Sequence, residues 1–100
     1  MAFEIKWTPR ALESYMDNIA YLEREWSENE IMNFVNAVDE KIKLTALFPE
    51  LFVATNRRKG IHRVVINKQV ILFYRVRKAL SQIELLLFWN THQNPDNIKV

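Results

Sequence analysis

Basic side chains that could bind phosphate or other anions are concentrated in one third of this 100-residue chain. The stretch from Leu51 to Ile83 contains no Asp or Glu and eight bases: Arg57, Arg58, Lys59, Arg63, Lys68, Arg75, Arg77 and Lys78. Such a cationic region attracts RNA, DNA, a ribosome or an acidic protein. The net charge of +2 hides this segregation, because residues 1–50 carry ten acids and five bases, whereas residues 51–100 carry two acids and nine bases. The second half is therefore predicted to contain a partner-binding surface.

Three groups in or near this basic tract have more than one chemical interpretation. The loop triplet Arg57 to Lys59 fits an RNA or ribosome contact, although short basic clusters in loops are commonly only solvated. Arg75 and Arg77 lie on the same side of a predicted strand, where they either line an anionic site or pair with Glu84 and with acids of a partner. Histidine side chains ordinarily titrate near neutrality, so His92 fits either a general acid or base or a hydrogen-bonding surface residue.

The composition excludes several other kinds of chemistry. The chain has no cysteine, so neither a disulfide nor a thiol nucleophile is expected, and two well-separated histidines argue against a zinc site. We therefore expect no metal and no cofactor. The sequence lacks a secretion signal and any apolar run approaching the ~18 residues that cross a bilayer, which predicts a cytoplasmic protein without membrane association. With 49% apolar residues, residues 1–100 form one small domain.

The first half of the chain has the periodicity of one strand and two helices. Apolar and polar residues alternate from residue 3 to residue 7, as in a half-buried strand. The Thr8-Pro9 start signal and apolar residues at three- and four-residue steps predict a helix from about Pro9 to Glu25. Residues 27–30 are typical of a capping box and begin a second helix that ends before Pro49. The short link between the helices predicts an antiparallel helical hairpin.

The second half of the chain predicts a sheet. Apolar runs at Ile61–Ile66, Gln69–Val76 and Gln82–Trp89 are separated by short polar turns, which indicates a three-stranded antiparallel meander joined by the first strand. The last two runs do not alternate, so we expect strands that are apolar on both faces, one face covering the helices and the other requiring a partner. His62 and Arg63 face opposite ways, so only one is expected to serve a site. The predicted fold class is α+β, a small sheet packed on two helices.

This order of elements and the motifs at their junctions resemble the RelE/ParE superfamily of bacterial toxin-antitoxin toxins. The motifs are Trp7-Thr8-Pro9-Arg10-Ala11, Leu47-Phe48-Pro49, Gly60-Ile61-His62-Arg63, Phe73-Tyr74-Arg75-Val76 and Phe88-Trp89-Asn90-Thr91-His92-Gln93-Asn94-Pro95. Each motif is weak, but their order and spacing extend over essentially the whole chain. The resemblance implies a cytoplasmic toxin, ParE-like or of the plasmid-stabilisation type, neutralised by a cognate antitoxin whose flexible segment folds as it binds. It is compatible with a homodimer and with a toxin-antitoxin hetero-oligomer. The expected antitoxin- or target-binding residues are Arg57, Arg58, Lys59, Arg75 and Arg77.

The resemblance includes two branches with different activities. The ParE-like branch blocks DNA gyrase, whereas the RelE-like branch cuts messenger RNA on the ribosome with basic residues and a tail tyrosine or a glutamate-histidine pair. Arg63 and His92 match basic positions of the RelE-like set. However, Ile71 replaces its phosphate-binding arginine and Ile98 falls near its tail tyrosine. We therefore expect inhibition of a cellular target such as DNA gyrase. The alternative is a ribosome-dependent mRNA endoribonuclease that uses Arg63 and His92, and a simple nucleic-acid-binding module is the least favoured interpretation.

Overall fold

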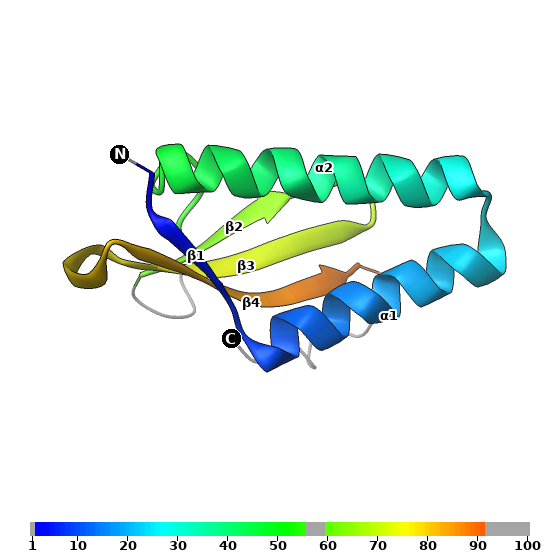
Figure 1. Ribbon diagram of the computed structural model, residues 1–100, viewed down its shortest axis with the longest axis horizontal. Coiled ribbons are helices and arrows are strands. Elements are labelled where there is room, and N and C mark those ends of the chain that lie inside the picture. The colour runs from blue at the N-terminus through cyan, green and yellow to red at the C-terminus, as the bar shows by residue number, and fades with distance from the viewer. Residues whose placement is uncertain (1, 56–59, 92–100) are drawn as a thin grey trace.

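Two long helices lie over one face of a four-stranded sheet (Figure 1). The computed structural model describes residues 2–55 and 60–91. Its elements are β1 (Glu4–Trp7), α1 (Pro9–Glu25), α2 (Glu28–Leu47), β2 (Ile61–Val65), β3 (Val70–Arg77), the short 3-10 helix η1 (Lys78–Leu80) and β4 (Gln82–Asn90). The predicted α+β order of strand, helical hairpin and meander is confirmed.

The two helix starts differ in how well they were predicted. Thr8 caps α1 as expected, because its Oγ1 accepts a hydrogen bond from the Ala11 amide at 3.1 Å and Pro9 takes the first helical position. Ser27 is the N-cap of α2, but its side chain makes no capping hydrogen bond. Its backbone carbonyl accepts from the Glu30 amide at 3.1 Å instead. The hydroxyl half of the predicted capping box is therefore wrong.

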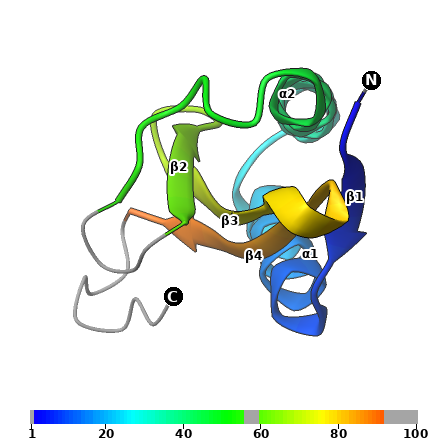
Figure 2. The ribbon, with the colours of Figure 1, turned by 90° about the vertical axis from the view of Figure 1, so that its left-hand side faces the viewer.

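The sheet has the strand order β1-β4-β3-β2, so β1 and β2 are its edges (Figure 2). The meander β2-β3-β4 is antiparallel, as predicted, and β1 joins it by pairing in parallel with β4. Phe73 of β3 pairs with Leu87 and the next residue, Tyr74, pairs with Leu85, so β4 has one extra residue, Leu86, at a β-bulge. Because of this bulge, Leu85 and Phe88 both face the helices although they are three positions apart in the chain.

The main core lies between the helices and the sheet. Its centre is aromatic: Phe88 stacks on Trp7 with ring centroids 5.5 Å apart, and Tyr15 lies 5.3 Å from Phe88. Tyr15 in turn stacks on Phe34 of α2, so the rings connect both helices to β4. The buried apolar members of this core are Ala11, Phe34, Val38, Val64, Ile66, Val70, Leu72, Tyr74, Ile83, Leu85 and Phe88.

A second apolar cluster lies on the sheet face that points away from the helices. Ile61, Phe73, Leu87 and Trp89 are buried there, and Ile71 and Leu86 pack against them. This confirms the prediction that the central strands are apolar on both faces. Among the described residues, neither helix is long and apolar enough to span a membrane.

Candidate functional site

The structure brings three of the predicted site residues onto one face of the sheet. Arg63 of β2 is paired across the sheet with Phe73, and Arg75 of β3 is paired with Ile61. Cross-strand partners share a face and residues two apart on a strand share a face, so Arg63, Arg75 and Arg77 all lie on the side of the second apolar cluster. The predicted residues Arg57, Arg58, Lys59 and His92 lie outside the described residues.

Glu84 on β4 neutralises part of this arginine surface. Its carboxylate accepts from Nε of Arg77 at 2.7 Å and lies 4.0 Å from Nη1 of Arg75. Of the two alternatives for Arg75 and Arg77, the structure shows the contacts with Glu84. Within residues 2–55 and 60–91, Arg63 makes no ion pair. The surface consequently keeps an excess of positive charge, which suits an acidic partner.

Ile71 gives the middle of this face an apolar character. It lies opposite Val65 on one side and opposite Trp89 on the other, and it packs against the second apolar cluster. The residue paired with Arg63 is Phe73, which is also apolar. The described residues also contain no group of three acids or histidines that could hold a metal ion. The described part of this face therefore combines cationic side chains with apolar ones.

His62 faces the opposite way from Arg63 and has a structural environment. Its side chain is on the helix side of the sheet, and the residue is only 8% exposed. Nδ1 lies 2.9 Å from the Phe52 carbonyl oxygen, and the ring stacks on Tyr74 with centroids 5.4 Å apart. The expectation that only one of the two neighbours is available to a site is confirmed, and the available one is Arg63.

Tyr74 of β3 is hydrogen-bonded to the segment that follows α2. Its hydroxyl donates to the Pro49 carbonyl oxygen at 3.0 Å, and the ring is fully buried. Burial raises the pKa of Tyr74 to about 12, because the phenolate is poorly solvated there, and a backbone hydrogen bond from Phe52 opposes the rise only in part. Tyr74 therefore holds Pro49 and Phe52 in place beside β2 and β3.

The raised pKa of Tyr74 predicts a loss of stability in alkaline solution. The pKa of the Tyr74 phenol is near its ordinary value of 10.0 in the unfolded chain and about 12 in the folded protein. As the pH rises from 10 towards 12, the unfolded state therefore loses this proton first. The free energy of unfolding falls over that range, because deprotonation favours the unfolded state. We expect Tyr74→Phe to cost about 1 kcal/mol at pH 7, through loss of the bond to Pro49. The variant should also lose less stability than wild type between pH 9 and pH 11. Urea unfolding at both pH values measures this, and equal pH dependence of the two proteins would contradict it.

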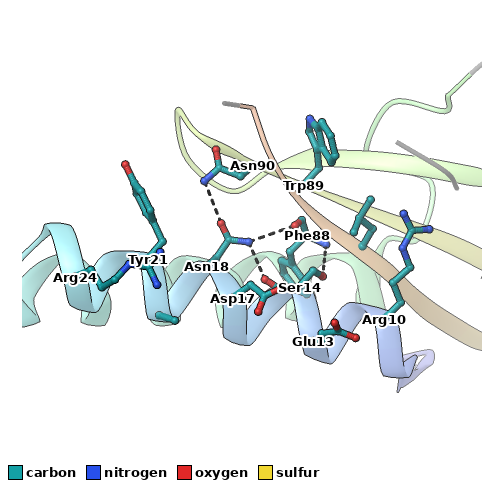
Figure 3. A pocket seen from close by; sticks show the side chains of 12 residues that line it. Arg10, Glu13, Ser14, Asp17, Asn18, Tyr21, Arg24, Phe88, Trp89 and Asn90 are labelled. Atoms are coloured by element: carbon teal, nitrogen blue, oxygen red, sulfur yellow. Dashed lines mark hydrogen bonds between the residues drawn. The ribbon is translucent and has the colours of Figure 1, made fainter. Parts of the chain in front are cut away.

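A polar pocket of about 760 Å³ lies between α1 and the end of β4 (Figure 3). Asn18 is at its centre: Nδ2 donates to the Ser14 carbonyl at 2.9 Å and to the Phe88 carbonyl at 3.3 Å, and Oδ1 accepts from Asn90 at 3.4 Å. Its rim has charges of both signs. The lining residues are Arg10, Glu13, Ser14, Asp17, Asn18, Ala20, Tyr21, Arg24, Leu87, Phe88, Trp89 and Asn90.

The residues of this polar pocket were missed in the sequence, although a signal for them exists. Arg10, Ser14, Asp17, Tyr21 and Arg24 recur at three- and four-residue steps and so form one stripe of α1. A polar stripe is ordinarily assigned to solvent. Here part of it faces the edge of β4, beyond the point where β1 ends.

An apolar groove of about 590 Å³ opens where α2 ends, and we call it the α2-end groove. The apolar residues that line it include Phe3 beside β1, Val76 of β3, and Leu47, Phe48 and Leu51 around the end of α2. Lys78 of η1 and Glu50 also line it and form an ion pair with each other. The groove is on a different side of the molecule from the polar pocket and shares no lining residue with it.

Comparison with known proteins gives a family match and several structural likenesses. Residues 5–95 match the family model described as the ParE toxin of type II toxin-antitoxin system, parDE. No curated protein is a significant sequence match. A chain of the chromosomal ParDE system from P. aeruginosa has a TM-score of 0.72 and 13% identity, over 89% of this chain and 96% of that chain.

Two further structures have the same fold at low sequence identity. The isolated E. coli RelE toxin has a TM-score of 0.67 and 10% identity, over 95% of this chain and 90% of that chain. A chain of the RelBE2 toxin-antitoxin complex from Mycobacterium tuberculosis has a TM-score of 0.62 and 12% identity, over 90% of this chain and 99% of that chain. At such identities the likeness concerns the fold alone.

Proposed function

Since the chain belongs to the ParE toxin family of type II toxin-antitoxin systems, we propose that it is neutralised by direct binding of a cognate antitoxin and acts in the cytoplasm by inhibiting a target such as DNA gyrase. The family match extends over residues 5–95 and therefore includes every helix and strand except the first residue of β1. The apolar side chains of the sheet face support gyrase rather than RNA as the target. The positive charge of the same face supports it as the surface that binds the antitoxin.

The apolar surroundings of Ile71 are the observation that favours target inhibition over RNA cleavage. Cutting RNA requires a base, an acid and cations placed where charge develops on the phosphate. The middle of the sheet face instead presents Ile71 between Val65 and Trp89, in contact with the second apolar cluster. Removing one such charge-stabilising group from an enzyme commonly costs about 10²–10³ in kcat. Arg63 alone among the described residues does not replace it.

The arginines of the same sheet face support it as the surface that binds the antitoxin. Arg75 and Arg77 are only partly neutralised by the single carboxylate of Glu84, and Arg63 adds a further positive charge beside them. An acidic segment that folds as it binds gains both ion pairs and apolar contacts on such a face. We extend this surface to Arg57, Arg58 and Lys59, which precede β2 in the chain.

Two assays on the purified toxin test the target. In a supercoiling assay, the toxin should inhibit DNA gyrase, and Arg63→Ala should inhibit to within about twofold of wild type, since Arg63 has no catalytic task in this proposal. In a translation extract, the toxin should leave messenger RNA intact. Cleavage of mRNA on ribosomes that is abolished by Arg63→Ala and by His92→Ala would establish the ribonuclease alternative instead.

A separate measurement tests the antitoxin surface. The probe is the product of the reading frame adjacent to the toxin gene, purified alone and titrated against the toxin. Arg75→Gln combined with Arg77→Gln should weaken binding by about tenfold or more at physiological salt, because charge-assisted contacts are lost. Lys43→Gln is the matched control, since Lys43 is an exposed cation on α2 that already pairs with Asp39. Equal affinities of the double variant and the control would exclude this surface.

A further inference from the structure

The α2-end groove combines a hollow with exposed apolar side chains. Phe48 is 57% exposed and Leu51 is 58% exposed, although both residues also line the groove. Leu47 beside them is 55% exposed, and Leu80, two residues after Lys78, is 58% exposed. Exposed apolar side chains that lie next to one another often mark a binding site.

The charges around the α2-end groove are balanced, in contrast to the arginine-rich sheet face. Lys78 pairs with Glu50 across the groove rim, and Lys6 pairs with Glu4 at 2.9 Å on the neighbouring strand β1. Each of these cations therefore has an acid beside it. An acidic or a basic partner would find no excess of opposite charge around the groove. A partner with the same balanced charges would fit.

We propose that the α2-end groove is a self-association surface, whose occupant is a second copy of this chain related by a two-fold axis. A two-fold interface uses the same patch on both copies, so it needs a knob and a hollow together and charges that complement themselves. Phe48 and Leu51 of one copy supply the knob for the groove of the other. Lys78 and Glu50 exchange partners, so that each lysine meets the glutamate of the second copy. This surface is separate from the sheet face and does not depend on the cellular target.

Sedimentation of the full-length toxin free of antitoxin tests this surface. Wild type should form a dimer in reversible equilibrium with the monomer, and Leu51→Lys should weaken dimerisation by about tenfold or more, as expected for a charge placed in an apolar contact. Met32→Lys is the matched control, because Met32 is 57% exposed and lies about 20 Å along α2 from the C-terminal end of that helix, where the groove opens. Both changes affect exposed side chains, so both variants should keep the wild-type circular dichroism and melting temperature.

A charge-exchange experiment distinguishes this two-fold contact from other modes of association. Lys78→Glu alone and Glu50→Lys alone should each weaken the homodimer, because like charges then meet at both symmetric contacts. Mixing the two variants should restore dimerisation, since both contacts in the heterodimer again join opposite charges. An apolar contact without this geometry predicts no such rescue.

Three results would overturn the proposal. The first is a wild-type toxin that remains monomeric at the highest soluble concentration. The second is a dimer that Leu51→Lys and Met32→Lys weaken equally, and the third is failure of the mixed variants to associate better than either alone. If Leu51→Lys instead abolishes binding of the adjacent-frame product while leaving self-association unchanged, the groove belongs to the antitoxin.

Discussion

Replacing Phe88 by alanine is expected to lower the free energy of unfolding by about 3–5 kcal/mol, the usual cost of emptying an aromatic site in a core. Phe88 is 2% exposed and its ring contacts Trp7 and Tyr15, so the cavity would lie where β1, α1 and β4 meet. A domain of this size has a total stability of roughly 5–15 kcal/mol, so the loss would be a large share of it. The midpoint of urea unfolding is the measurement.

Phe48→Ala is the matched control for this change. It removes the same atoms from a side chain that is more than half exposed, and we expect a loss below about 1 kcal/mol. The comparison isolates burial from the chemistry of the substitution. If the two variants were equally stable, the placement of Phe88 in the main core would be wrong.

Ser14→Ala is expected to cost about 1–3 kcal/mol, because it leaves a backbone donor of β4 without its partner. The Ser14 hydroxyl accepts from the Phe88 amide at 2.9 Å and donates to the Ala11 carbonyl at 3.0 Å. The direct test is amide hydrogen exchange, in which the Phe88 amide should lose protection more than its neighbours on β4.

Ser14→Thr provides the control, since it keeps a hydroxyl at the same position. We expect this variant to retain most of the stability and the protection of the Phe88 amide. Combining Ser14→Ala with Asn18→Ala should cost less than the sum of the single changes, because both side chains serve the same residue of β4. Unchanged exchange at Phe88 in Ser14→Ala would mean that water or another group satisfies this amide.

The elements of this fold could be predicted because their signals are local. The start of α1 follows from Thr8 and Pro9 in adjacent positions, and the predicted helix from Pro9 to Glu25 is the helix observed. The meander follows from runs of β-branched and aromatic residues separated by short turns. The parallel direction of β1 and its place beside β4 were not predictable, since they depend on pairing between distant segments. The Ser27 hydroxyl was over-interpreted, because a capping sequence permits the bond without requiring it.

The candidate site was predicted unevenly for similar reasons. Strand alternation placed Arg75 and Arg77 on one side of a strand and left pairing with Glu84 as one of two alternatives, which the structure shows. Resemblance indicated that Ile71 replaces a cation, and the structure shows its apolar neighbours. The roles of Ser14 and Asn18 could not be found in this way, because polar residues on an amphipathic helix look the same whether they face water or a strand edge. Ser14 and Asn18 contact β4 because β1 pairs with β4 only as far as Leu85 and leaves the edge of β4 beyond that residue open to α1.

The parallel pairing of β1 with β4 also determines the order in which the chain can fold during synthesis. The Thr8 hydroxyl donates to the carbonyl of Leu85, which lies 77 positions later, so the first strand has no partner until almost all the chain has been made. Contacts between such distant positions slow folding, because a long loop must close before they form. The helical hairpin can form first, but the sheet that carries the arginines closes last. A chain whose synthesis stops before β4 therefore lacks the strand that joins β1 to β3 and leaves the sheet incomplete.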